Sequence, residues 1–176
     1  MANPFFTIGH STRPISEFVD LLLGEQVRLV VDVRTVPRSR TNPQFNRETL
    51  PDSLTAHGIG YQHIAELGGL RGKQRSAESS ANTFWQNSSF RNYADYALTP
   101  EFRVGFDRLR ALGNERRVAV MCAEAVWWRC HRRIIADYLL TAGESVFHIL
   151  APGKVEAARL TPAARPRDGL SLVYSG

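Results

Sequence analysis

The sequence predicts an α/β fold: a single three-layer domain with a mainly parallel sheet of about five strands and helices on both faces. Short aliphatic runs alternate along the chain with longer segments of helical periodicity. This alternation is typical of parallel strands joined by right-handed helical crossovers. The aliphatic runs are also nearly continuous, as expected for strands covered on both faces. The length of 176 residues fits one domain with an ordinary core.

The expected strands lie at residues 5–8, 28–33, 59–64, 118–122 and 146–150. Ser16 is the expected N-cap of the first helix, and Gly24 its end, because serine caps helix starts and glycine favours helix ends. The second helix is expected from about residue 47 to residue 57, with Pro51 in its first turn. Together these assignments place one helix after each of the first two strands.

Two helical patterns follow the third strand. One covers residues 90–97, and the other opens with Thr99 as its cap and is expected to end at Gly113. A last helix is predicted over residues 129–142, directly after the fourth strand. Arg129, Arg132 and Arg133 would then lie in its first turn, where positive charge is unfavourable unless a negative group is nearby.

Residues 1–150 are expected to form the single α/β domain. Residues 151–176 are expected to be a C-terminal extension that is partly disordered or adds an edge strand at 170–174. The longest apolar runs are far shorter than the roughly 20 residues of a membrane-spanning helix, and no charged-then-apolar leader is seen. The sequence therefore predicts a cytoplasmic protein with no membrane partner, and it indicates no oligomeric state.

The basic residues are almost all arginine. The net charge is +5, and lysine occurs only at Lys73 and Lys154. A GC-rich genome would raise the arginine content, but arginine also binds phosphate and carboxylate through two parallel hydrogen bonds. Four arginines and no acid lie between Arg34 and Arg47, and Arg71, Lys73 and Arg75 follow the third strand. Loops at one end of the sheet would then share a positive potential that attracts anions.

In open α/β sheets, ligands bind at the carboxyl ends of the strands. The candidate catalytic residues at these ends are Cys122, His10, Glu124 and Asp32. The candidate substrate-binding residues are Ser11, Arg34, Ser39, Arg40, Tyr61, Arg129, Cys130, His131 and Arg132. Cys122 precedes a helix start rich in arginine, which favours a thiolate nucleophile. His10 could carry a proton, since histidine titrates near neutral pH.

Other roles remain open for several of these residues. Cys122 could be a small buried side chain, His10 a turn residue, and Asp32 the partner of a loop arginine. Cys122 and Cys130 do not form a disulfide framework, and both are expected to stay as thiols in a reducing compartment. Their spacing matches no compact zinc module, and the adjacent arginines would repel a cation, so no metal or other cofactor is expected.

Taken in order, these motifs resemble the domain-of-unknown-function family numbered 488. The matching residues are Thr7 to Ser11, Asp32 to Arg34 with Pro37 and Ser39, Tyr61 with Leu67 to Gly69, Cys122 and Glu124 with Cys130 to Arg132, and His148 with Ile149. The resemblance covers about residues 5–150 and implies a compact bacterial or archaeal α/β domain with no settled activity. Residues 126–128 depart from the family pattern, which has an acidic residue and a proline before the second cysteine.

Three functional hypotheses follow. The first is an enzyme or ligand-binding domain for a phosphate-bearing or other anionic small molecule or nucleotide, with Cys122 as nucleophile. The second is nucleic-acid binding or processing, through arginines and the stacking surfaces of Trp127 and Trp128. The third is a non-catalytic adaptor whose basic face meets an acidic partner.

Overall fold

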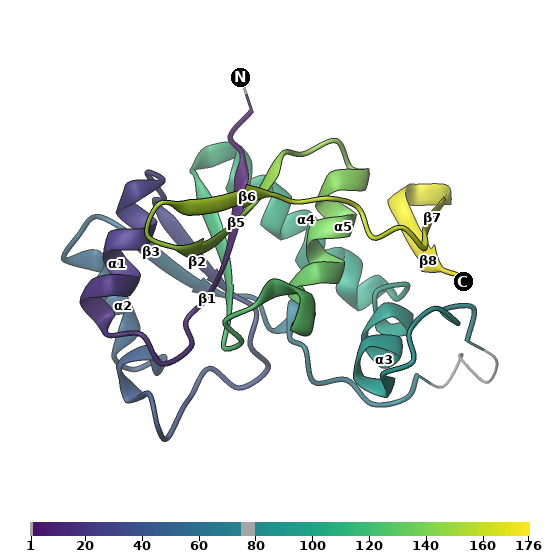
Figure 1. Ribbon diagram of the computed structural model, residues 1–176, viewed down its shortest axis with the longest axis horizontal. Coiled ribbons are helices and arrows are strands. Elements are labelled where there is room, and N and C mark those ends of the chain that lie inside the picture. The colour runs from purple at the N-terminus through teal and green to yellow at the C-terminus, as the bar shows by residue number, and fades with distance from the viewer. Residues whose placement is uncertain (1, 75–79) are drawn as a thin grey trace.

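The computed structural model describes residues 2–74 and 80–176 and contains a six-stranded mixed sheet of order β3-β2-β4-β1-β5-β6 (Figure 1). Its strands are β1 (Phe5–Gly9), β2 (Leu29–Asp32), β3 (Gly60–His63), β4 (Val118–Cys122), β5 (Val146–Ala151) and β6 (Lys154–Ala157). The first five are parallel, and β6 is antiparallel to β5. The predicted α/β class and mainly parallel sheet are confirmed.

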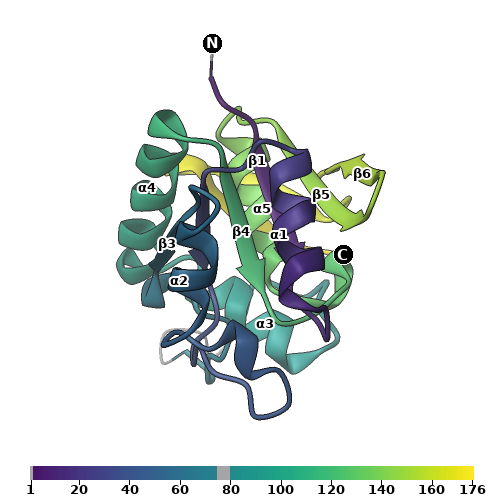
Figure 2. The same ribbon diagram turned by 90° about the vertical axis from the view of Figure 1, so that its left-hand side faces the viewer.

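Helices cover both faces of this sheet (Figures 1 and 2). The helices are α1 (Ile15–Gly24), α2 (Leu50–Thr55), α3 (Ser88–Tyr96), α4 (Pro100–Glu115) and α5 (Arg132–Thr141). Alternate strand residues face opposite sides: Phe6 and Val30 pack with α1 and α2, while Phe5 and Val31 pack with α4 and α5. In Figure 2, the arrow of β4 points towards α3, which lies beyond the carboxyl ends of the strands.

Several helix boundaries differ from the sequence expectations. Pro14, not Ser16, is the N-cap residue of α1. Helix α4 continues through Gly113, because this glycine is packed against the ring of Phe5 and does not terminate the helix. Helix α5 begins at Arg132, since a 3-10 turn and the extended backbone of Cys130 precede it. Only the last two of the three arginines therefore belong to α5.

The segment after residue 150 contains three strands and so follows the strand alternative of the sequence analysis. β6 provides the sixth strand of the main sheet, and β7 (Ala164–Arg167) pairs with β8 (Ser171–Tyr174) in a separate hairpin. The expected edge strand at residues 170–174 therefore pairs elsewhere. Tyr174 anchors this hairpin: its hydroxyl donates to Asp137 at 2.8 Å, and its backbone N–H donates to Asn82 at 2.8 Å. Within the described residues, no helix has the length and apolar character needed to cross a membrane.

Candidate functional site

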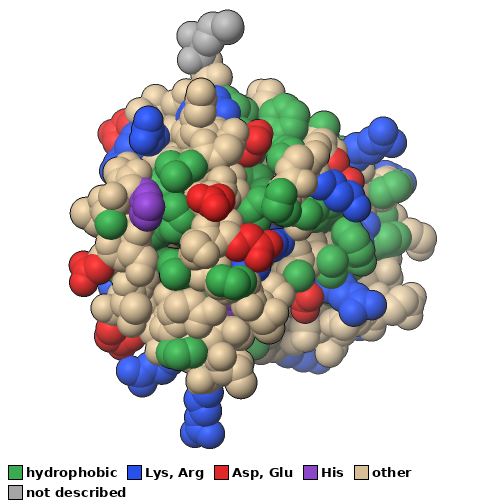
Figure 3. Space-filling model, turned by 60° about the vertical axis from the view of Figure 1, so that its left-hand side comes forward, with side chains coloured by type: hydrophobic (Ala, Val, Ile, Leu, Met, Phe, Trp, Pro, Cys, Tyr) green, Lys and Arg blue, Asp and Glu red, His purple; other side chains and the backbone are tan. Residues whose placement is uncertain are grey.

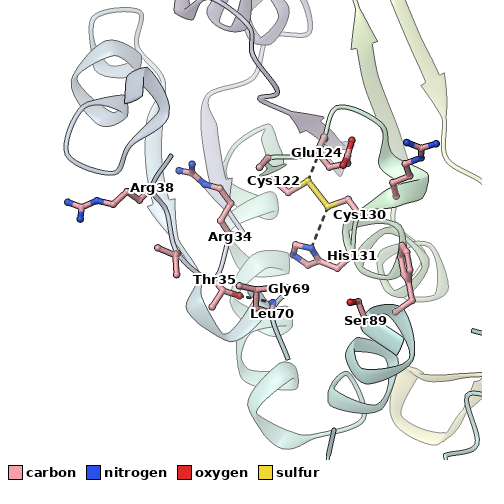
Figure 4. Close-up of a pocket in the computed structure, with 14 residues that line it drawn as sticks. Arg34, Thr35, Arg38, Gly69, Leu70, Ser89, Cys122, Glu124, Cys130 and His131 are labelled. Carbon is pink, nitrogen blue, oxygen red and sulfur yellow. Dashed lines mark hydrogen bonds between the residues drawn. A yellow bond between two sulfur atoms is a disulfide. The ribbon is translucent and has the colours of Figure 1, made fainter. Parts of the chain in front are cut away.

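A pocket of about 470 Å³ lies at the carboxyl ends of β2 and β4 (Figure 4). Its walls come from the loops after β2, β3 and β4, from the start of α3 and from the turn before α5. The lining residues are Arg34, Thr35, Val36, Arg38, Gly69, Leu70, Ser89, Phe90, Cys122, Ala123, Glu124, Arg129, Cys130 and His131. Three arginines and both cysteines of the chain thus share one recess.

Close packing between β1 and the loop after β4 fixes the position of Cys122. The N–H of His10 donates to the Cys122 carbonyl at 2.9 Å, and the N–H of Ser11 donates to the Ala123 carbonyl at 3.0 Å. Gly9 lies directly under the carbonyl group of Glu124, where any Cβ atom would overlap the carbonyl oxygen. The Gly-His-Ser sequence therefore serves as a platform for the loop that carries Cys122 and Glu124.

The sulfur atoms of Cys122 and Cys130 are in direct contact and face the pocket (Figure 4). Two thiols were expected from the sequence at these positions, but a contact between them was not. The seven residues between the cysteines fold back through a 3-10 turn at Trp127–Arg129, and this turn returns the chain to the end of β4. A spacing of eight positions did not reveal this return, because the turn depends on packing of the loop over β1.

Arg132 is fully buried behind Cys122. Its Nε donates to the Cys122 sulfur at 3.1 Å, its Nη2 to the Glu124 carbonyl at 2.8 Å, and its Nη1 to the Thr7 hydroxyl at 3.0 Å. No carboxylate among the described residues forms an ion pair with it. Burial lowers the pKa of Arg132 to about 9, partly offset by the charge of Glu124. The guanidinium thus has a sulfur atom where a buried cation usually has a carboxylate.

Thr7 and His148 hold Arg132 in place. The Thr7 hydroxyl accepts from Arg132, so its own proton is directed at Nδ1 of His148, 2.6 Å away. Burial, assisted by the charge of Arg132, lowers the pKa of His148 to about 3, which keeps the ring neutral. A neutral ring can accept the Thr7 proton, whereas a protonated one could not. The buried chain of groups therefore runs from Cys122 through Arg132 and Thr7 to His148.

His131 contacts the second sulfur. Its Nε2 lies 2.8 Å from the Val33 carbonyl, and its Nδ1 lies 3.4 Å from Cys130 Sγ. A carbonyl only accepts hydrogen bonds, so Nε2 carries the proton and Nδ1 presents a lone pair to the sulfur. Burial lowers the pKa of His131 to about 4. The ring packs on Gly69, where a Cβ atom would overlap it.

A second set of buried polar side chains holds Arg34 in place. The guanidinium of Arg34 makes two hydrogen bonds to Asp32, at 2.9 and 2.7 Å, and Tyr61 donates a further one to the same carboxylate. Nη1 of Arg34 lies 3.3 Å from Nε2 of His10, whose ring stacks on Phe45. Burial lowers the pKa of His10, and the hydrogen bond to the Ser11 carbonyl opposes this shift. His10, Asp32 and Tyr61 thus fix Arg34 from behind.

The structure brings six of the predicted site residues into the pocket: Cys122, Glu124, Arg34, Arg129, Cys130 and His131. Four more form the layer behind it: His10, Asp32 and Arg132 contact pocket residues, and Tyr61 contacts Asp32. Ser11, Ser39 and Arg40 do not line it. Ser39 accepts from the N–H of Asn42 and stabilises its own loop, and Arg40 is exposed. Arg75 lies outside the described residues.

Eight pocket residues were not among the candidate site residues of the sequence analysis: Thr35, Val36, Arg38, Gly69, Leu70, Ser89, Phe90 and Ala123. Gly69 could have been found, because it belongs to the Leu-Gly-Gly motif. Ser89 and Phe90 had no signal in the sequence, since α3 reaches the pocket only through the packing of its aromatic residues on α4 and α5. No cluster of three or more histidine, cysteine or acidic side chains in the described part of the chain is arranged to hold a metal ion.

These features define an α/β protein with a pocket at the carboxyl ends of its strands, lined by a cysteine pair, a histidine and arginines. The chain belongs to the DUF488 family: the family model described as "Domain of unknown function DUF488" matches residues 14–139. The matched range contains both cysteines and all the pocket residues, while the Gly-His-Ser platform and His148 lie outside it. Comparisons with curated proteins and with solved structures give no match.

Proposed function

We propose that this protein is a cysteine-dependent enzyme for an anionic small molecule, with the Cys122 thiolate of the reduced form as its nucleophile. The observation that carries the proposal is the contact between Cys122 Sγ and the buried Arg132, which has no carboxylate partner among the described residues. A buried cation without a counter-ion is costly, and a thiolate at Cys122 supplies that counter-ion.

The charge of the pocket supports an anionic substrate. Arg34, Arg38 and Arg129 line it, and Glu124 is the one acid that does so among the described residues. Arg34 is oriented by Asp32, whereas Arg129 is exposed at the rim and forms no ion pair within the described part of the chain. Arginines held at the mouth of a recess raise the local concentration of anions. Phosphate or carboxylate groups of a small molecule or nucleotide fit this lining.

The two candidate proton carriers, Glu124 and His10, lie at different distances from the pocket opening. Glu124 is exposed beside Cys122 and can exchange protons with the pocket. His10 lies behind Arg34, and its Nε2 already faces Arg34 Nη1. Glu124 is therefore the better candidate for direct proton transfer, and His10 and Asp32 act through the position of Arg34.

Nucleic-acid binding has no comparable support. The ring of Trp127 is stacked on His148, with centroids 4.5 Å apart, and its Nε1 donates to Glu156. Only Trp128 has a largely exposed ring, at 45%. On the face shown in Figure 3, basic side chains are spread around the outline with acidic ones between them, and form no continuous basic track.

Alkylation of the reduced Cys130→Ser variant tests the proposal. Cys122 is expected to react at pH 7 at least about tenfold faster than a free cysteine, because a nearby cation favours the thiolate. It is also expected to prefer iodoacetate to the neutral iodoacetamide, and inorganic phosphate should protect it. The matched control is Cys122→Ser, which retains only Cys130. Reaction at the rate of a free cysteine, with iodoacetamide preferred, would overturn the proposal.

A further inference from the structure

We propose that the reaction of this site is thiol–disulfide exchange with an anionic low-molecular-weight disulfide, in which Cys122 attacks the substrate and Cys130 resolves the intermediate. This inference rests on the proposed function and names its substrate class. A thiolate that attacks a phosphoryl or acyl group needs no second thiol. Here a second cysteine lies within bonding distance of the first, and both sulfurs face the same pocket.

The two sulfurs have different neighbours, and these assign their roles. Cys122 contacts the guanidinium of Arg132, a permanent positive charge that holds a thiolate ready for attack. Cys130 contacts Nδ1 of His131, a neutral nitrogen with a free lone pair, and accepts from the N–H of Arg132 at 3.4 Å in the first turn of α5. Cys130 thus has no side-chain cation among its hydrogen-bond partners within the described residues, so it is expected to stay a thiol until the first step has taken place.

The exchange balances without a metal or an organic cofactor. The Cys122 thiolate attacks one sulfur of the substrate, the S–S bond of the substrate breaks, and the first half leaves as a thiolate. Cys130 gives its proton to the thiolate released in the first step, attacks Cys122 Sγ and expels the second half. The substrate has then gained two electrons, and the protein has lost two as the Cys122–Cys130 disulfide. A low-molecular-weight thiol restores the dithiol by the reverse sequence.

In the structure the two sulfur atoms are in contact, which is the arrangement that attack of Cys130 on Cys122 Sγ requires. The pocket volume of about 470 Å³ suits a small molecule rather than a protein disulfide. Its lining combines arginines with the apolar side chains of Leu70 and Phe90. A disulfide whose halves are short and end in carboxylates would place its sulfurs at Cys122 and its charges towards Arg34, Arg38 and Arg129.

Three disulfides of similar size but different charge test this inference: dithiodipropionate (anionic), hydroxyethyl disulfide (neutral) and cystamine (cationic). The fully reduced protein is mixed anaerobically with each, and released thiol and protein mass are followed. Wild-type protein is expected to react fastest with dithiodipropionate, release two thiols and end without an adduct. The Cys130→Ser variant should release one thiol and keep one thiopropionate on Cys122. The Cys122→Ser variant should react at least about tenfold more slowly, because its remaining thiol lacks the arginine contact.

Two arginine variants control for charge. Arg129→Ala removes a pocket charge and should lower the rate with dithiodipropionate about threefold or more, with little change for hydroxyethyl disulfide. Arg28→Ala removes the same charge from an exposed position at the opposite end of β2 and should leave both rates unchanged. His131→Asn should leave formation of the mixed disulfide intact and slow its resolution, which separates positioning of Cys130 from attack by Cys122.

A stable adduct on wild-type protein, or a preference for cystamine, would overturn the inference. If iodoacetate alkylates Cys122 rapidly in either case, the proposed function still stands, because a reactive thiolate with a preference for anions is then present. Only the assignment of a disulfide as the substrate would be wrong. Slow alkylation and slow exchange together would remove both proposals.

Discussion

His131 Nε2 lies 2.8 Å from the carbonyl oxygen of Val33, and this contact ties the start of α5 to the end of β2. Arg34 follows Val33 directly, and Cys130 precedes His131. One hydrogen bond therefore sets the position of the cysteine turn relative to the arginine loop. This hydrogen bond connects the two walls of the pocket directly, and such supporting contacts keep the side chains of a site in fixed positions.

Arg132→Met should separate the chemical role of Arg132 from its structural one. Methionine has a similar length and removes a buried charge that has no carboxylate partner. The free energy of unfolding of the oxidised protein should therefore fall by less than about 3 kcal/mol, the cost of breaking a buried ion pair. In the reduced protein, alkylation of Cys122 at pH 7 should slow by about tenfold or more, because the thiolate loses its cation. Urea unfolding of the oxidised form and iodoacetate kinetics of the reduced form provide the two measurements. An unchanged alkylation rate in a folded variant would show that Arg132 does not activate Cys122.

Gly9→Ala should destabilise the protein by about 3 kcal/mol or more, because a Cβ atom would overlap the Glu124 carbonyl and move the loop that carries Cys122. Gly24→Ala is the matched control: a Cβ there meets nothing within 4 Å, at the end of α1. Its expected effect is between zero and a gain of about 1 kcal/mol. Thermal or urea unfolding of both variants measures the difference, and equal stabilities would contradict the close approach of β1 to this loop.

Asp32→Asn should cost about 3 to 5 kcal/mol, because it leaves the buried Arg34 without its counter-charge. Glu48→Gln breaks the exposed pair with Arg38 and should leave the free energy of unfolding almost unchanged, because solvent screens this pair. Urea unfolding at one ionic strength compares the two variants. The Asp32 variant should also bind inorganic phosphate more weakly, since Arg34 is free to turn away from the pocket. Similar losses in both variants would show that the Asp32–Arg34 pair does not act as a buried ion pair.

The stability of the protein should fall as the pH is lowered from 7 to 5. The pKa of His148 is lowered to about 3 in the folded protein from an ordinary value of 6.5. The unfolded chain therefore binds a proton at pH 5 that the folded chain does not, which favours unfolding by about 2 kcal/mol at this residue alone. His148→Gln should flatten the pH dependence of the unfolding free energy, whereas the exposed His57→Gln should leave it unchanged. A His148 variant with the wild-type slope would contradict burial of the neutral ring.

The strands and the position of the pocket could be predicted because they depend on local patterns. The strands β1, β2 and β4 are mostly apolar and buried over their whole length, and chain order places their ends together in a parallel sheet. Cys122, Arg34, Arg129 and His131 were therefore correctly expected at one end of the sheet. The helix expected at residues 47–57 is too long, because only Leu50–Thr55 forms α2 and turns lie before and after it.

The rest depends on long-range packing. Whether an arginine faces a pocket or is buried behind it depends on partners far along the chain, as Thr7 is for Arg132, 125 positions away. The contact between the two cysteine sulfurs required the turn at Trp127–Arg129 to fold back onto β4, which no spacing rule signals. The hairpin of β7 and β8 was missed as well, because Pro166 weakens the strand pattern there.

β1 has a neighbour on each side, β4 and β5, and both follow it by more than a hundred residues. During synthesis this strand emerges from the ribosome long before either partner exists, and its two edges stay unprotected in the meantime. Folding must then close large loops before β1 can pair with β4 and β5, which predicts slow refolding and a need for chaperone protection of the nascent chain.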